Sequence, residues 1–163
     1  MKLPSLLLVL LSSVAISLGA EVSPIRMTVE QLSKTESKDK TGRDKTQIRS
    51  LKITLNNNSA EAFDGLTVKY WFLGRAVTDP KTIILSEGER KSMLTPRGKD
   101  FVESEVISKH SVEAHYGAAK AGAKPTKVPA SGEKISGYAV RVLKDGKVLA
   151  EYYSEPSYKA LIK

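Results

Sequence analysis

Alternation of apolar and polar residues recurs along the chain and predicts a series of β-strands. Leu51, Ile53 and Leu55 alternate with Lys52 and Thr54, which is the period of two expected of a strand that buries one face. The same pattern predicts further strands over residues 25–32, 66–72, 81–85 and 90–94. Residues 101–107 and 111–116 have a mixed pattern and are predicted only as extended chain.

The hairpin predicted over residues 137–153 is the most sharply defined unit. Tyr138, Val140 and Val142 lead into Asp145-Gly146, and a second β-rich run follows. Asp-Gly between two such runs favours a two-residue type I′ turn, because that turn needs a positive φ at both central residues.

Two segments lack the strand pattern. Residues 34–45 are almost wholly polar and predict a mobile, charged loop. Residues 117–134 consist mainly of Ala, Gly, Lys, Pro and Ser, a composition that buries too little apolar surface to offset its ordering entropy. We therefore expect a long flexible loop there, and loops of this length are often either disordered or functional.

These elements predict an all-β fold, because no amphipathic helix of any length stands out. About seven or eight short strands joined by turn-rich loops favour an antiparallel, immunoglobulin-like β-sandwich. A small closed β-barrel is the alternative, since the number of strands does not separate the two.

The N-terminus predicts export. Lys2 precedes an apolar run over residues 6–18 and the small pair Gly19-Ala20, the arrangement of a secretory signal peptide. The run is shorter than the about 20 apolar residues of a membrane span. We expect cleavage near the Ala20–Glu21 bond, with the Gly19–Ala20 bond as the alternative. The mature chain is then a single domain over residues 21–163 without a transmembrane span, located in the periplasm, on the outer-membrane surface or outside the cell.

Composition and charge restrict the kinds of partner that the protein is expected to bind. The chain carries 26 Lys and Arg against 18 Asp and Glu, a net charge of +8, which favours anionic partners. For an exported protein these are acidic glycans, anionic lipid headgroups or acidic protein surfaces. Nucleic acid is not expected, because the aromatic residues are few and lie within strand patterns. The chain has no cysteine, which excludes disulfides, thiol catalysis and cysteine-based zinc sites.

Several segments together resemble a known group. The chain is similar to small exported immunoglobulin-like proteins of Verrucomicrobia, of the Akkermansia type. The segments that carry the resemblance are Leu51-x-Ile53-x-Leu55-Asn56-Asn57, Gly65-Leu66-x-Val68-x-Tyr70-x-Phe72, Gly137-Tyr138-x-Val140-x-Val142 with Asp145-Gly146-Lys147, and Ser154-x-Pro156-Ser157. Some members are associated with envelope loci resembling type IV pilus systems, which implies a surface or periplasmic binding role. No prepilin-type cleavage site precedes the hydrophobic run, so the resemblance implies an accessory protein rather than a major pilin.

The candidates for catalysis are few. His110 and His115 are five residues apart, which on a strand places them on opposite faces, and with Glu113 they match no known metal-ligand geometry. The S-x-x-K patterns that begin at Ser37 and Ser131 lie in polar segments and are interpreted as chance matches. We expect no metal, no cofactor and no enzymatic activity. An enzyme that uses these histidines or loop carboxylates in an unrecognised site is a third hypothesis.

Asn57-Asn58-Ser59 forms an N-glycosylation sequon. The simpler interpretation is a turn, because asparagine tolerates left-handed backbone and hydrogen-bonds its own chain.

Trp71 is a candidate contact residue. Alternation along its strand places it on the outward face with Thr67 and Lys69, where an indole could stack on a sugar or anchor a protein interface. The interpretation that we favour is that a loop or the strand edge covers it, or that a bulge turns it inward, because large aromatic residues are mostly buried.

Lysines on the predicted loop are the other candidate contacts, and they are Lys120, Lys124 and Lys127. Such cations can attract an anionic glycan or lipid, although a solvated loop explains them as well. The sequence thus predicts a non-enzymatic envelope or surface binding module, with a glycan-binding module as the alternative.

Overall fold

The structure is a computed structural model that describes residues 23–38, 40–117 and 124–163. The expected signal peptide and Lys120 lie outside these residues. The elements are β1 (Ile25–Ser37), β2 (Asp44–Asn57), β3 (Phe63–Ala76), β4 (Ile83–Leu94), β5 (Lys99–Glu103), β6 (Ile107–Val112), β7 (His115–Tyr116), β8 (Lys127–Val128), β9 (Ser131–Lys144), β10 (Lys147–Tyr153) and the 3₁₀ helix η1 (Pro156–Ala160). None of the described helices is long and apolar enough to cross a membrane.

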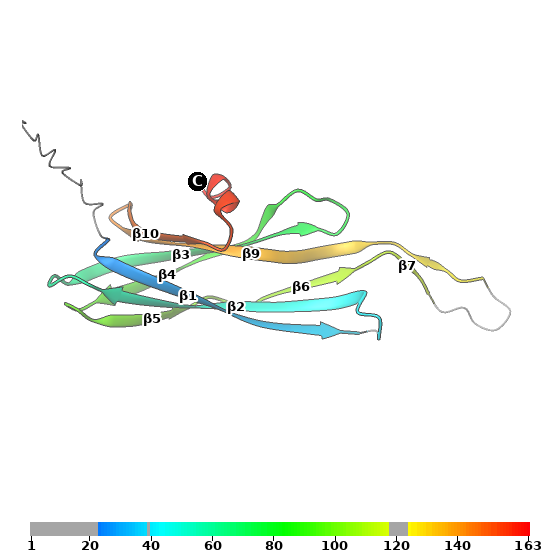
Figure 1. Cartoon of the computed structure of the whole chain (residues 1–163), viewed down its shortest axis with the longest axis horizontal. Coiled ribbons are helices and arrows are strands. Elements are labelled where there is room, and N and C mark those ends of the chain that lie inside the picture. Colours follow the sequence, from blue (N-terminus) through cyan, green and yellow to red (C-terminus); the bar gives the residue numbers. More distant parts are fainter. Residues whose placement is uncertain (1–22, 39, 118–123) are drawn as a thin grey trace, which may run out of the picture.

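The strands form two antiparallel layers that face each other along an elongated molecule (Figure 1). In one layer β2 pairs with β1 on one side and with β5 and β6 on the other. In the second layer β3 lies between β4 and β9, and β10 pairs with the other side of β9. We call these the β2 sheet and the β3 sheet. The first residues of β9 also pair with β6, which joins the layers at one end.

This arrangement confirms the prediction of an antiparallel β-sandwich. The described strands leave β1, β4, β5 and β10 as edges, so the two layers do not close into a barrel and that alternative is wrong.

The core lies between the two sheets and follows the alternation in the sequence. Leu51, Ile53 and Leu55 are fully or almost fully buried on β2, and Val68 and Tyr70 face them from β3. Burying a side chain of this size contributes about 1.5–3 kcal/mol, so these alternating rows select the register of each strand.

The predicted loop over residues 34–45 is mostly wrong. β1 continues to Ser37 and β2 begins at Asp44, and the two strands pair without a register break from Ile25↔Asn57 to Ser37↔Lys45. Polar residues on both faces hide the alternation, while backbone pairing still holds the ribbon together.

Other predicted boundaries also change. The strands predicted over 81–85 and 90–94 are one strand, β4, and the extended segments over 101–116 divide into β5, β6 and β7. In the predicted 117–134 loop, Lys127–Val128 forms β8 against β7, and β9 begins at Ser131.

The predicted hairpin is confirmed. β9 and β10 pair across Lys147↔Lys144, and the turn residues Asp145 and Gly146 have φ values of 50° and 80°. These positive values are those that a type I′ turn requires.

The C-terminal segment, residues 154–163, contains η1 and lies on the outer face of the β3 sheet (Figure 1). It buries a second apolar cluster outside the sandwich core, whose members are Trp71, Leu73, Ala139, Tyr158 and Ile162. The face that alternation predicts as outward is therefore covered.

Candidate functional site

Trp71 is part of the protein interior. Its side chain is on the outward face of β3, as alternation predicts, yet the residue is only 8% exposed because Tyr158 and Ile162 pack over it. The indole Nε1 donates a hydrogen bond to Oε2 of Glu87 at 3.0 Å. The interpretation that Trp71 is covered is confirmed, and the proposal of an exposed contact at this residue is wrong.

Polar bonds hold the C-terminal segment in place. Arg141, on the outward face of β9, donates from Nε to the hydroxyl of Tyr153 at 2.9 Å and from Nη2 to the carbonyl of Ile162 at 2.8 Å. Lys159 donates to Glu151, and this bond holds the pKa of the Glu151 carboxyl below its ordinary value. Burial raises the pKa of the Tyr158 hydroxyl. The cover over Trp71 thus has both apolar and charged attachments.

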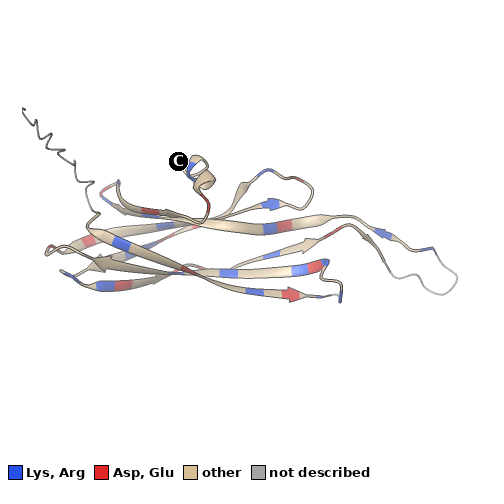
Figure 2. Cartoon of the chain, in the orientation of Figure 1, with Lys and Arg blue, Asp and Glu red and all other residues tan. Residues whose placement is uncertain are grey.

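Of the three lysines predicted as contacts, the structure describes Lys124 and Lys127. Both are exposed near the β7–β8 hairpin. The neighbouring Lys134 lies in β9 and donates to Oε1 of Glu113 at 2.7 Å, which lowers the pKa of that carboxyl. Figure 2 shows basic and acidic residues distributed over both layers.

The two histidines have separate local partners. His110 Nε2 lies 2.7 Å from Oδ1 of Asp44, and His115 Nδ1 lies 2.8 Å from the carbonyl oxygen of Glu113. Within the described ranges no group of three or more His, Asp or Glu side chains could hold a metal ion.

Asn57 has the structural role that its turn interpretation predicts. The residue is 3% exposed. Its amide donates to the carbonyls of Glu61 and Thr95, at 2.6 and 2.9 Å, and its side-chain oxygen accepts from the N–H of Ser59 at 2.9 Å. The sequon amide therefore ties the β2–β3 turn to the end of β4.

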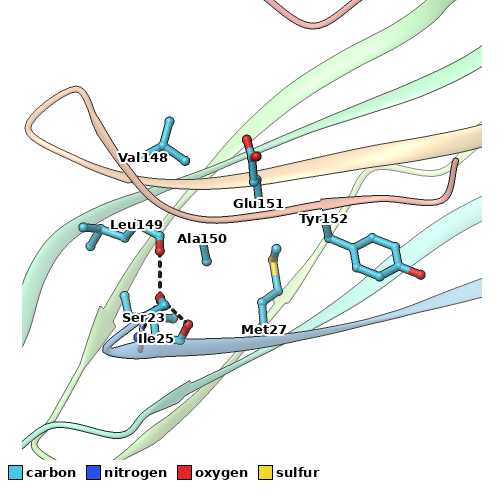
Figure 3. Close-up of a pocket in the computed structure, with 8 residues that line it drawn as sticks. All are labelled: Ser23, Ile25, Met27, Val148, Leu149, Ala150, Glu151 and Tyr152. Carbon is cyan, nitrogen blue, oxygen red and sulfur yellow. Dashed lines mark hydrogen bonds between the residues drawn. The ribbon is translucent and has the colours of Figure 1, made fainter. Parts of the chain in front are cut away.

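A groove of about 540 Å³ opens where the edge strands β1 and β10 approach each other (Figure 3). Ile25 and Met27 line one side, and Leu149 and Tyr152 line the other. The hydroxyl of Ser23 lies 2.8 Å from the carbonyl oxygen of Leu149, at the bulge in β10. This contact closes one end of the seam between the sheets.

The outer face of the β2 sheet carries an exposed aromatic residue with two cations. Phe101 is 54% exposed, and the ammonium nitrogens of Lys99 and Lys52 lie 4.7 and 5.5 Å from its ring centroid. We call these three residues the Phe101 patch. The mixed pattern of apolar and polar residues over 101–107 does not predict this patch.

Strand pairing positions the Phe101 patch. Phe101 on β5 lies opposite Thr54, and Lys52 on the neighbouring strand lies opposite Glu103. Asp100 is on the opposite, inward face of β5 and accepts a hydrogen bond from Ser92 of β4 at 2.6 Å. β5 is thus held by its pairing with β2 and by the Asp100–Ser92 hydrogen bond to β4.

Comparison with known proteins finds similarity to solved structures alone. No family model matches the sequence, and no curated protein matches it significantly. A solved structure from Akkermansia muciniphila is similar at 16% identity and a TM-score of 0.39, covering 80% of this chain and 70% of that one. The structural genomics target SoR45 of the Northeast consortium is similar at 14% identity and a TM-score of 0.38, covering 82% and 88%.

Proposed function

We propose that the protein is a non-enzymatic, exported binding or scaffold module of the bacterial envelope or cell surface. The Phe101 patch is its contact surface, and the sandwich holds that patch in a fixed position. The observation that carries the proposal is an exposed aromatic ring on paired strands, with two lysine ammonium groups within 5.5 Å of the ring centroid.

The physical argument starts from the cost of leaving Phe101 exposed. A large apolar side chain in water is an unused source of binding energy, and aromatic residues are enriched at interfaces. Because β5 is paired to β2 and tied to β4 through Asp100, little backbone entropy is lost when a partner covers the ring.

The two lysines define the chemistry of the partner. Their ammonium groups carry three donors each, and only some of these can point at the ring. An acidic protein surface that covers Phe101 would accept the remaining hydrogen bonds, and complementary charge would speed the encounter. We therefore propose an acidic envelope protein as the partner, with the module as an accessory of a pilus-like assembly.

A glycan partner is the second candidate, now placed on a different residue. The Trp71 platform is covered, whereas the Phe101 ring could lie against the apolar face of a sugar. The ammonium groups of Lys52 and Lys99 lie 5.5 and 4.7 Å from the ring centroid, where they would meet the carboxylate of an acidic glycan.

Site-specific photocrosslinking in intact envelopes tests the proposal. One variant carries a photoreactive residue in place of Phe101. The matched control carries it in place of Met93, which is 66% exposed on the other sheet. We expect position 101 to capture one envelope component, identified by mass spectrometry, and position 93 to capture none above background.

Charge removal then separates specific binding from general attraction. Lys52→Gln with Lys99→Gln should reduce capture at position 101 at least tenfold, while Lys124→Gln with Lys127→Gln leaves it unchanged. Capture of a polysaccharide in place of a protein would favour the glycan candidate. Equal capture at both positions, lost at moderate salt, would contradict the assignment of the patch.

A further inference from the structure

Edge strands expose unpaired backbone groups, and most edges of this sandwich carry a feature that blocks pairing. β10 has a bulge at Leu149, β5 is five residues long and turns Asp100 inward, and β4 has a register break and Gly88. β1 differs from these edges, because it pairs with β2 over 13 residues without a register break. It contains neither proline nor glycine.

The open side of β1 has a defined set of backbone groups. The carbonyl of Pro24 accepts from the N–H of Asn58 on the β2 side at 2.8 Å. Hydrogen-bonding groups alternate between the two sides of a strand in an antiparallel sheet. The odd-numbered residues from 27 to 35 therefore direct their N–H and C=O groups to the open side, where no strand of the described residues is hydrogen-bonded to β1. Strand β10 lies close only to the first residues of β1, at Ile25 and Met27.

The outward face of β1 has a self-complementary sequence around Leu32. Leu32 is 48% exposed and lies in a shallow apolar depression with Ile48 and Val106. On the same face, Glu30 lies two residues before it and Lys34 two residues after it. A second β1 that runs antiparallel, with Leu32 opposite Leu32, sets each Glu30 opposite a Lys34.

We propose that two copies of this chain pair through their β1 edges about a two-fold axis at Leu32. A two-fold interface uses the same patch on both copies, and strand addition supplies backbone hydrogen bonds along the shared edge. Leu32 occupies a non-hydrogen-bonded position, where opposing side chains come closest. The two exposed leucines then cover each other between two Glu30–Lys34 pairs, in which each Lys34 meets Glu30 of the other copy as well as Glu36 of its own strand, which lies 2.7 Å away.

Over the residues of β1 itself (Ile25–Ser37), neighbouring registers are less favourable. In the Leu32 register the next cation along, Lys38, would lie opposite Arg26 but comes after the strand has ended. With Glu30 on the axis, Glu30 faces Glu30 and Arg26 faces Lys34, and like charges directly opposite each other destabilise a sheet. With Ser33 on the axis, Glu30 faces Glu36. With Gln31 on the axis, Arg26 faces Glu36, but Leu32 faces the carboxylate of Glu30 instead of another apolar side chain.

Charge reversal tests the interface in solution. The protein is purified as the expressing cells produce it, and its molecular mass is measured by sedimentation equilibrium over a range of concentrations. We expect a reversible monomer–dimer equilibrium. Glu30→Lys or Lys34→Glu alone should weaken association about tenfold, because each places like charges opposite each other twice. The double variant Glu30→Lys/Lys34→Glu should restore it.

Cysteine crosslinking tests the register, and the absence of native cysteine makes it unambiguous. Under mild oxidation, Leu32→Cys should form a disulfide-linked dimer far faster than Met93→Cys, an exposed control on the β4 edge. Both side chains are exposed, so folding is not at risk. A protein that stays monomeric at all concentrations, or equal crosslinking at the two positions, would overturn the proposal.

Discussion

The two sheets each place an aromatic residue on their outer face, with opposite outcomes. Trp71 on β3 is 8% exposed, whereas Phe101 on β5 is 54% exposed. The difference comes from the C-terminal segment, which folds back over the β3 sheet and leaves the β2 sheet open. Alternation decides which side of a sheet a residue is on, and the rest of the chain decides whether that side meets water.

Removing each aromatic side chain gives the largest expected contrast. Trp71→Ala deletes the centre of the covered cluster and should lower the free energy of unfolding by about 3–5 kcal/mol. Phe101→Ala, on the open face, should change it by less than about 0.5 kcal/mol. Urea denaturation followed by far-UV circular dichroism measures both, and similar losses for the two variants would contradict the contrast.

Gly137 lies on β9 where the C-terminal segment (residues 154–163) packs closely against the strand. A methyl group added at this position should loosen the packing of that segment. A Cβ at this position would come within 2.6 Å of the Tyr158 ring and also meet the Ser154 hydroxyl. Gly137→Ala should cost about 1–3 kcal/mol by overpacking and shift the emission of Trp71 to longer wavelength. Gly117→Ala is the control, because its nearest neighbour would be the Thr126 carbonyl oxygen at 3.5 Å. An unshifted emission in Gly137→Ala would argue against close packing of the C-terminal segment.

Alkaline pH should lower the free energy of unfolding through the buried tyrosines of the β3 sheet and the C-terminal segment. Burial raises the pKa of Tyr158, and burial with its neighbour Tyr152 raises the pKa of Tyr138 to about 12. A raised folded-state pKa stabilises the protein below the ordinary tyrosine pKa of about 10, and this stabilisation is lost as the pH rises toward the folded value. Urea denaturation at stepwise higher pH should show a decline that Tyr158→Phe partly removes. A stability that is flat across this range would contradict the burial of these hydroxyls.

The lysines of the open face should matter least for stability. Lys52→Gln and Lys99→Gln each remove one of the two cation–π contacts to Phe101, and each should cost less than about 0.5 kcal/mol. Because the two lysines contribute to binding and not to folding, the midpoint of thermal unfolding should barely change in these variants, while photocrosslinking at position 101 falls. A large loss of stability would make the Phe101 patch a structural element.

Much of the sandwich could be predicted from local pattern. Leu51, Ile53 and Leu55 identify a buried strand face, and Asp145-Gly146 fixes a hairpin, because in both cases the signal lies within a few residues. Where both faces of a strand are polar, as over residues 34–37, alternation carries no information and the strand is missed. The charged residues around Gly88 likewise hide the fact that β4 is one continuous strand. Gly88 has a structural reason within that strand, because the absence of a Cβ makes room for the Tyr70 hydroxyl.

The candidate sites depend on long-range contacts and could not be predicted. Trp71 is covered by Tyr158 and Ile162, which are about half a chain away in sequence. Phe101 gains its cations from β5 itself and from Lys52 on a paired strand. The Lys99 contact is local, since Lys99 lies two residues before Phe101 on the same strand, but the contact with Lys52 and the covering of Trp71 do not follow from neighbouring residues.

Acrylamide quenching of tryptophan fluorescence tests the contrast between the two faces most directly. Trp71 is the single tryptophan, so the unmodified protein reports on the covered face, and a Trp71→Phe/Phe101→Trp variant reports on the open face. We predict weak quenching of Trp71 and strong quenching of a tryptophan at position 101. Quenching of Trp71 as strong as in the urea-unfolded protein would show that the C-terminal segment does not cover it, and would contradict the account.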